Sequence, residues 1–132
     1  MARILIIDDD SAVCDYLATL VTRLGHQAVK AATCAEGLKR MADPSSEIII
    51  ADIYLPDSPD LEEWVGQLKA NARGRPLILI TGEPSEELAA KARGGEITAL
   101  LTKPFELAFI KGLLARASRE VPPPPPDASP DA

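Results

Sequence analysis

The residues best suited to chemistry are polar side chains that stand where short apolar runs end. Asp8 and Asp9 follow one such run, Asp52 closes a second, Thr81 closes a third and Lys103 follows a fourth. A single aspartate in such a position is more often a turn or helix-cap residue, because its side chain bonds nearby amides. If the runs are neighbouring parallel strands, however, their carboxyl ends meet at one edge of a sheet, where open α/β sheets bind ligands. The five residues therefore form one candidate site.

The residue types in this site indicate phosphate chemistry with a divalent metal. Three carboxylates in one crevice repel one another unless a cation compensates. Mg²⁺ is the natural cation, because it prefers oxygen ligands and is commonly held by carboxylates together with water and phosphate. Lys103 would supply a positive charge to a phosphate oxygen, and the hydroxyl of Thr81 would donate a hydrogen bond to another.

The elements that must position these residues are predicted from the hydrophobic periodicity. Short continuous apolar runs alternate with segments in which apolar residues recur every three or four positions. Strands are predicted over 4–7, 27–31, 47–52, 76–81 and 97–102, and helices over 11–24, 35–41, 61–71, 86–93 and 106–118. Alternating strands and helices favour parallel pairing with right-handed crossovers. The predicted fold is α/β, a doubly wound five-stranded parallel sheet with helices on both faces.

Four motifs in this order resemble the receiver domains of bacterial two-component response regulators, which have a flavodoxin-like fold. The motifs are Ile-Ile-Asp8-Asp9-Asp10, Ala51-Asp52-Ile-Tyr-Leu-Pro56, Thr81-Gly82 and Lys103-Pro104-Phe105. The resemblance extends over nearly the whole chain to about Arg119. It implies a signalling switch that accepts a phosphoryl group and changes its surface, rather than an enzyme acting on other molecules.

The resemblance also implies a role for each site residue. Asp52 would be the phosphoacceptor, Asp9 a direct Mg²⁺ ligand, and Asp8 a second acid that acts mostly through water. The backbone carbonyl of Tyr54 would be a further ligand. Thr81 and Lys103 would hold the phosphoryl oxygens, and the bond between Lys103 and Pro104 would be cis.

Two departures from the family pattern concern how a signal would spread. Asp60 stands where the family usually has a glycine, so the loop after Asp52 is expected to follow a different path, stiffened by Pro59. Leu100 stands where the family often has an aromatic residue, so the relay through the fifth strand is expected to differ.

Composition and charge indicate the class of partner. A chain of 132 residues with a net charge of −6 and no run of Lys and Arg is unsuited to direct contact with nucleic acid. The apolar runs are too short for a signal peptide or a membrane span, so we expect a cytoplasmic protein without membrane insertion. The resemblance implies a histidine kinase or phosphotransfer protein as phosphodonor and a protein as downstream target. A homodimer is left open.

Residues 1–119 are expected to form the receiver domain. The composition changes after Arg119: residues 120–132 include five consecutive prolines and are expected to be a disordered tail. With no room after Arg119 for a DNA-binding output domain, the chain resembles a stand-alone response regulator, and its output is expected to run through protein contacts or phosphotransfer.

Two other functions remain as alternatives. A phosphohydrolase of the haloacid dehalogenase type fits the run Asp8-Asp9-Asp10-Ser11 loosely, but a late acidic pair and a cap domain are missing. The second alternative is a receiver-like module that binds a partner without phosphorylation, although such modules usually lack at least one site residue.

Several remaining residues are assigned no catalytic role. Cys14 and Cys34 are expected to be reduced packing residues, and His26 a surface loop residue. Trp64 and Phe109 are expected in the core or a subunit interface. The pairs Glu62-Glu63 and Glu86-Glu87 are expected to be solvated charges in the first turns of helices.

Overall fold

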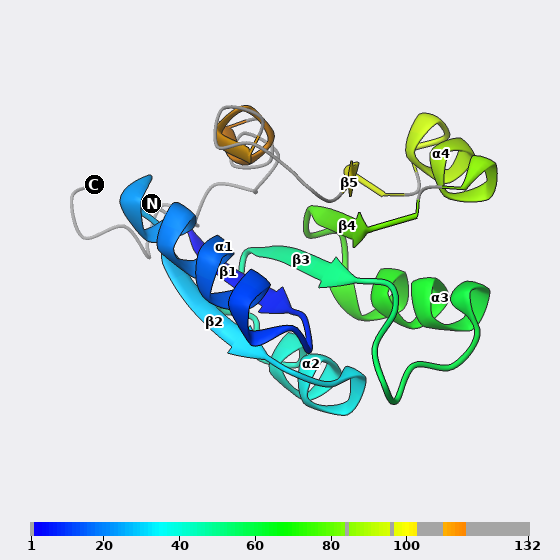
Figure 1. The fold of residues 1–132 in the computed structure, drawn as a ribbon, viewed down its shortest axis with the longest axis horizontal. Coiled ribbons are helices and arrows are strands. Elements are labelled where there is room, and N and C mark those ends of the chain that lie inside the picture. Colours follow the sequence, from blue (N-terminus) through cyan, green and yellow to red (C-terminus); the bar gives the residue numbers. More distant parts are fainter. Residues whose placement is uncertain (1, 84, 96, 103–109, 116–132) are drawn as a thin grey trace, which may run out of the picture.

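The structure is a computed structural model that describes residues 2–83, 85–95, 97–102 and 110–115. It contains a five-stranded parallel sheet in the order β2-β1-β3-β4-β5 (Figure 1). The strands are β1 (Arg3–Ile7), β2 (Gln27–Ala31), β3 (Ile48–Asp52), β4 (Leu77–Thr81) and β5 (Ala99–Thr102). The predicted fold class is confirmed, and β1 and β3 are central neighbours whose carboxyl ends lie side by side.

The helices that connect the strands begin at residues that cap them. They are α1 (Ser11–Arg23), α2 (Cys34–Met41), α3 (Leu61–Ala72) and α4 (Glu86–Arg93), and residues 110–115 are also helical. The caps are Asp10, Thr33, Asp60 and Ser85, and each side-chain oxygen accepts an amide N–H of the first turn. Such caps satisfy donors that would otherwise lack a partner inside the helix.

Two hydrophobic cores cover the two faces of the sheet. Alternate residues of each central strand point to opposite faces, so that Ile4 and Ile6 enter one core while Leu5 and Ile7 enter the other. The first core receives buried side chains of α1 and of residues 110–115, and the second receives those of α2, α3 and α4. This double burial explains why the strands are continuous apolar runs in the sequence.

Helix α2 packs closely on β1 because Gly37 has no side chain. A Cβ atom placed on Gly37 would lie 2.7 Å from Cδ1 and 3.0 Å from Cγ2 of Ile7, both closer than carbon atoms pack. Because Ile7 is the last residue of β1, the close approach places the first turn of α2 beside the carboxyl end of β1.

The carboxyl ends of α2 and α3 are joined by Arg75, a role that the sequence did not reveal. Its guanidinium donates hydrogen bonds of 2.7–2.8 Å to the carbonyls of Met41, Ser46, Asn71 and Ala72, and one of 3.3 Å to that of Asp43. Burial lowers the pKa of Arg75, and these carbonyls compensate for the lost water.

The observed elements differ from the predicted ones at several ends and at one side chain. Helix α1 ends at Arg23, α2 begins at Cys34, and β5 begins at Ala99. Tyr16, which the periodicity placed in the apolar stripe of α1, is 45% exposed, and the stripe is formed by Cys14, Leu17, Leu20 and Val21. Tyr16 lies at the edge of the stripe, where a phenol can remain in water. None of the helices among the described residues is both long and apolar enough to cross a membrane.

Candidate functional site

Three of the predicted site residues come together at the carboxyl edge of the sheet. Asp8 follows β1, Asp9 is next to it, and Asp52 is the last residue of β3. One carboxylate oxygen of each lies within 4.8 Å of the others. Asp8 and Asp52 are buried, whereas Asp9 is exposed. The cluster thus has one solvent-exposed carboxylate, and it is a set of oxygen ligands of the kind that suits Mg²⁺.

Backbone amides fix the two buried carboxylates. The N–H of Asp10 donates to Oδ1 of Asp8 at 2.9 Å, and the N–H of Tyr54 donates to Oδ1 of Asp52 at 2.8 Å. The third aspartate of the run caps a helix instead: Oδ1 of Asp10 accepts the N–H groups of Ala12 and Val13 at the start of α1. The three consecutive aspartates are therefore divided between the site and the helix cap.

Thr81 ends β4 and is completely buried, next to the end of β3. Its hydroxyl oxygen accepts the N–H of Glu83 at 3.0 Å, which shapes the loop after the strand. Lys103, Pro104, Phe105 and Phe109 lie outside the described residues, as do Pro84 and the tail from residue 116. Of the five predicted site residues, the structure thus describes Asp8, Asp9, Asp52 and Thr81.

The loop from β3 to α3, residues 53–60, borders the cluster. Ile53 and Leu55 are buried, whereas Tyr54 between them is 56% exposed. Asp60 has φ −61° and caps α3, so its position needs none of the conformational freedom of glycine. Ser58 closes a turn with Leu55, its hydroxyl donating to the Leu55 carbonyl at 2.8 Å.

Asp57 connects this loop to α2, and sequence reasoning missed the contact. Its two carboxylate oxygens accept the N–H groups of Cys34 at 2.8 Å and Ala35 at 3.1 Å, the first two residues of α2. These bonds lower the pKa of Asp57. No local signal could have shown them, because the partners are more than twenty residues away in the chain.

The residues to which no chemistry was assigned are mostly placed as expected. Cys14 and Cys34 are free and buried, and burial, followed by the charge of Asp57, raises the pKa of Cys34 to about 12. Trp64 is buried in the core. Glu62, Glu63, Glu86 and Glu87 are exposed in the first turns of their helices. His26 lies in the loop before β2 and is half-buried, and its Nδ1 accepts the Ala2 N–H at 2.9 Å.

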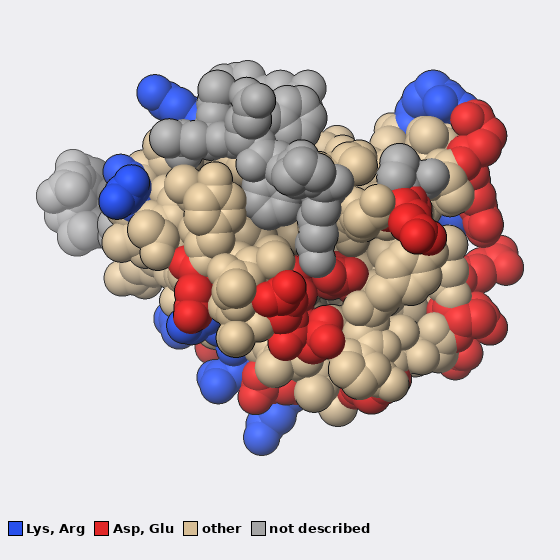
Figure 2. Space-filling model, viewed as in Figure 1, with Lys and Arg blue, Asp and Glu red and all other residues tan. Residues whose placement is uncertain are grey.

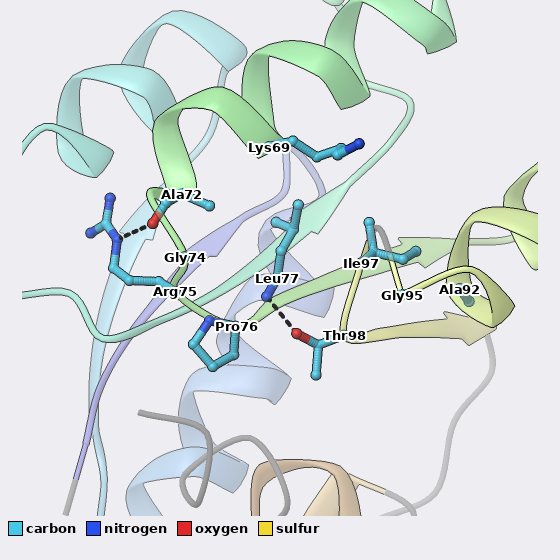
Figure 3. A pocket seen from close by; sticks show the side chains of 10 residues that line it. All are labelled: Lys69, Ala72, Gly74, Arg75, Pro76, Leu77, Ala92, Gly95, Ile97 and Thr98. Carbon is cyan, nitrogen blue, oxygen red and sulfur yellow. Dashed lines mark hydrogen bonds between the residues drawn. The ribbon is translucent and has the colours of Figure 1, made fainter. Parts of the chain in front are cut away.

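Two cavities lie at opposite ends of the strands. A small one of about 200 Å³ adjoins the carboxylates and is lined by Asp8, Asp9, Ser11, Lys30 and Glu36 among others. A second, of about 430 Å³, lies where β4 begins and is lined by residues at the ends of α3 and α4 and before β5 (Figure 3). The side chains drawn in Figure 3 include none of the carboxylates, so this second cavity is separate from the acidic site.

Acidic side chains dominate part of the surface around the cluster. Figure 2 shows them where β1 and β3 end and again along the side formed by α3 and α4. This distribution favours cations at the carboxyl edge of the sheet.

Comparison with known proteins identifies the family. The model of the response regulator receiver domain matches residues 4–115. The chain is 28% identical over 123 residues to the DNA-binding transcriptional regulator NtrC of Azospirillum brasilense, covering 93% of this chain and 25% of NtrC. It is 32% identical over 122 residues to the transcriptional regulatory protein GltR of Pseudomonas aeruginosa, covering 86% of this chain and 49% of GltR. The chain therefore spans about a quarter to a half of the length of these relatives.

A solved structure agrees with this assignment. The CheY-like response regulator receiver domain protein from Methanospirillum hungatei is 25% identical, with a TM-score of 0.77 over 91% of this chain and 96% of that one. Members of the matching family are signalling phosphoacceptors of two-component systems and bind Mg²⁺ at a cluster of acidic residues. The sequence match, the parallel five-stranded sheet and the carboxylate cluster lead to one conclusion: the chain belongs to the response regulator receiver domain family.

Proposed function

We propose that the chain accepts a phosphoryl group on Asp52 with Mg²⁺ bound by the adjacent carboxylates, and that the change in its surface regulates a partner protein or passes the phosphoryl group on. The observation that supports this most is the convergence of Asp8, Asp9 and Asp52, with one ligand atom of each within 4.8 Å of the others. Such a cluster of negative charge fits a hard divalent cation.

In the proposed reaction, a carboxylate oxygen of Asp52 attacks phosphorus of the donor. The bond between phosphorus and the leaving group breaks, and the leaving group departs with its electron pair. Asp8, Asp9, Asp52 and the backbone carbonyl of Tyr54 would hold the metal, which when bound neutralises charge on the phosphoryl oxygens. The amide of Tyr54 already orients Asp52, because it donates to Oδ1 at 2.8 Å.

Thr81 and Lys103 would contact the phosphoryl oxygens. The burial of Thr81 at the end of the neighbouring strand supports its part in the proposal. Attack of water on the aspartyl phosphate would return the carboxylate and release phosphate, so the protein would assist both its own phosphorylation and its decay.

A histidine kinase or phosphotransfer protein is the proposed donor, and a protein is the proposed downstream target. Residues 1–119 are proposed as the receiver domain, of which the family model matches 4–115, with residues 120–132 as a separate tail.

The test is intact mass spectrometry after incubation with acetyl phosphate and Mg²⁺. We expect one added phosphoryl group in the wild type, none in Asp52→Asn, and full labelling in the control Asp43→Asn, whose exposed carboxylate lies outside the cluster. A chelator should abolish labelling. Labelling of Asp52→Asn to the extent of the wild type would contradict the site. Continuous turnover of phosphate esters would instead support the hydrolase alternative, and no labelling of the wild type would support a module that works without phosphorylation.

A further inference from the structure

The loop of residues 53–60 carries the backbone of Tyr54 past the acidic cluster. Besides the bond from the Tyr54 amide to Asp52, hydrogen bonds attach the loop at three further points. The N–H of Ile53 donates to the carbonyl of Ile80 in β4 at 3.2 Å. Asp57 accepts two amides of α2, and Asp60 caps α3 by accepting the N–H of Glu63 at 2.8 Å. Of these three attachments, only the middle one, made by Asp57, joins the loop to α2.

The turn within the loop makes the middle attachment stiff. Ser58 donates its N–H to the Leu55 carbonyl at 3.0 Å and its hydroxyl to the same oxygen at 2.8 Å. Asp57 lies inside this closed turn, so a shift of its carboxylate would carry Leu55 and, next to it, Tyr54. The side chain of Leu55 is buried, which further resists independent movement of this part of the loop.

The partners of Asp57 are themselves well fixed. Cys34 is buried in the second core, and α2 is held against β1 by the close approach of Gly37 to Ile7. The position of α2 is therefore imposed by the sheet, and Asp57 transfers that position to the loop. A carboxylate at a helix start also interacts favourably with the amide dipoles there.

We propose that Asp57 is a positioning residue for the metal site: by accepting the amides of Cys34 and Ala35, it fixes the part of the loop from which the backbone of Tyr54 serves Mg²⁺ and Asp52. The inference rests on the proposed function and adds to it a residue outside the carboxylate cluster. Pre-organisation of this kind matters because metal affinity depends on how well the ligands are held before binding.

The test measures Mg²⁺ affinity by calorimetry and amide hydrogen exchange over residues 33–37 in the full chain. Asp57→Ala should bind Mg²⁺ about tenfold more weakly than the wild type, and Asp57→Asn about threefold more weakly, because an amide oxygen can still accept one of the two bonds. Exchange of the Cys34 and Ala35 amides should be faster in Asp57→Ala. All three proteins should fold, since Asp57 is exposed.

Asp60→Ala is the matched control, because it removes one negative charge and one helix cap from the same loop without touching α2. Its Mg²⁺ affinity should stay within about twofold of the wild type. Equal losses in Asp57→Asn, Asp57→Ala and Asp60→Ala would show that charge alone matters and would overturn the proposal. Unchanged affinity in Asp57→Ala would also overturn it.

The two proposals fail in different ways. If the wild type binds no Mg²⁺ and takes no phosphoryl group, the proposed function is wrong and the inference falls with it. If the wild type does both while Asp57→Ala binds Mg²⁺ equally well, only the positioning role of Asp57 is wrong.

Discussion

The indole nitrogen of Trp64 in α3 donates a hydrogen bond to the backbone carbonyl of Asp52 at 3.0 Å. Both residues are buried, and Trp64 is fully enclosed by the second core. The bond attaches the helix that follows the loop to the strand residue that we propose as phosphoacceptor. Since the chain has a single tryptophan, its fluorescence reports on the surroundings of Trp64, which include this contact.

We expect Trp64 fluorescence to change when Mg²⁺ and beryllofluoride are added. The indole contacts the backbone carbonyl of Asp52, and the side-chain carboxylate of Asp52 belongs to the proposed site. Binding at the site should therefore change the electric field at the indole ring. The measurement is a fluorescence titration of the wild type, with Asp52→Asn as control. A response of equal size in both proteins would show that the signal arises elsewhere.

Two glycines in helices should respond oppositely to alanine. Gly66 in α3 is exposed, and a Cβ atom at this position would have open space around it. Gly66→Ala should therefore stabilise the fold by about 0.5–1 kcal/mol through helix propensity. Gly37→Ala should destabilise it by about 1–2 kcal/mol, because the contact with Ile7 outweighs the same gain in propensity. Urea denaturation measures both changes in the free energy of unfolding. An increase in stability for Gly37→Ala would mean that α2 can move away from β1.

His26 should make stability depend on pH near neutrality. Burial lowers the pKa of His26, and its Nδ1 must be unprotonated to accept the N–H of Ala2. Below its ordinary value of about 6.5 the unfolded chain takes up a proton that the folded chain resists, so stability falls as pH drops from about 7.5 to 5.5. His26→Gln should show a smaller slope of unfolding free energy over this interval. The same slope in both proteins would refute the assignment.

Thr81→Ala should still accept phosphate, though more slowly, and should largely lose the activated conformation. The proposed switch depends on a hydrogen bond that the Thr81 hydroxyl would donate to the phosphoryl group, while its oxygen can still accept the N–H of Glu83 as it does now. With Leu100 in place of a ring, we expect residues 81–93 to change more than residues 97–102. Hydrogen exchange with and without beryllofluoride measures this.

A larger change in residues 97–102 of the wild type would contradict that account of the relay. So would a full response of Thr81→Ala, because it would show that the hydroxyl is dispensable for the switch.

The sequence by itself determined the fold and the carboxylate cluster. A strand buried on both faces must be continuously apolar, and a helix covering such a sheet must repeat its apolar residues every three or four positions, so both patterns are visible locally. The positions of Asp8, Asp9 and Asp52 at strand ends then bring them together once the sheet is parallel. The same local reasoning failed for Tyr16, because periodicity cannot tell the middle of an apolar stripe from its edge.

Only the tertiary structure decided the contacts that support the site. The bonds of Asp57 to α2, of Trp64 to the Asp52 carbonyl, and of Arg75 to carbonyls of two chain segments join residues that are distant in sequence or depend on side-chain direction. Asp10 and Asp57 are the same residue type as the members of the cluster, yet the carboxylate of each accepts amides at the start of a helix. The residue type determines which hydrogen bonds a side chain can accept or donate. Its actual partner depends on which amide groups helix packing brings within about 3 Å of it.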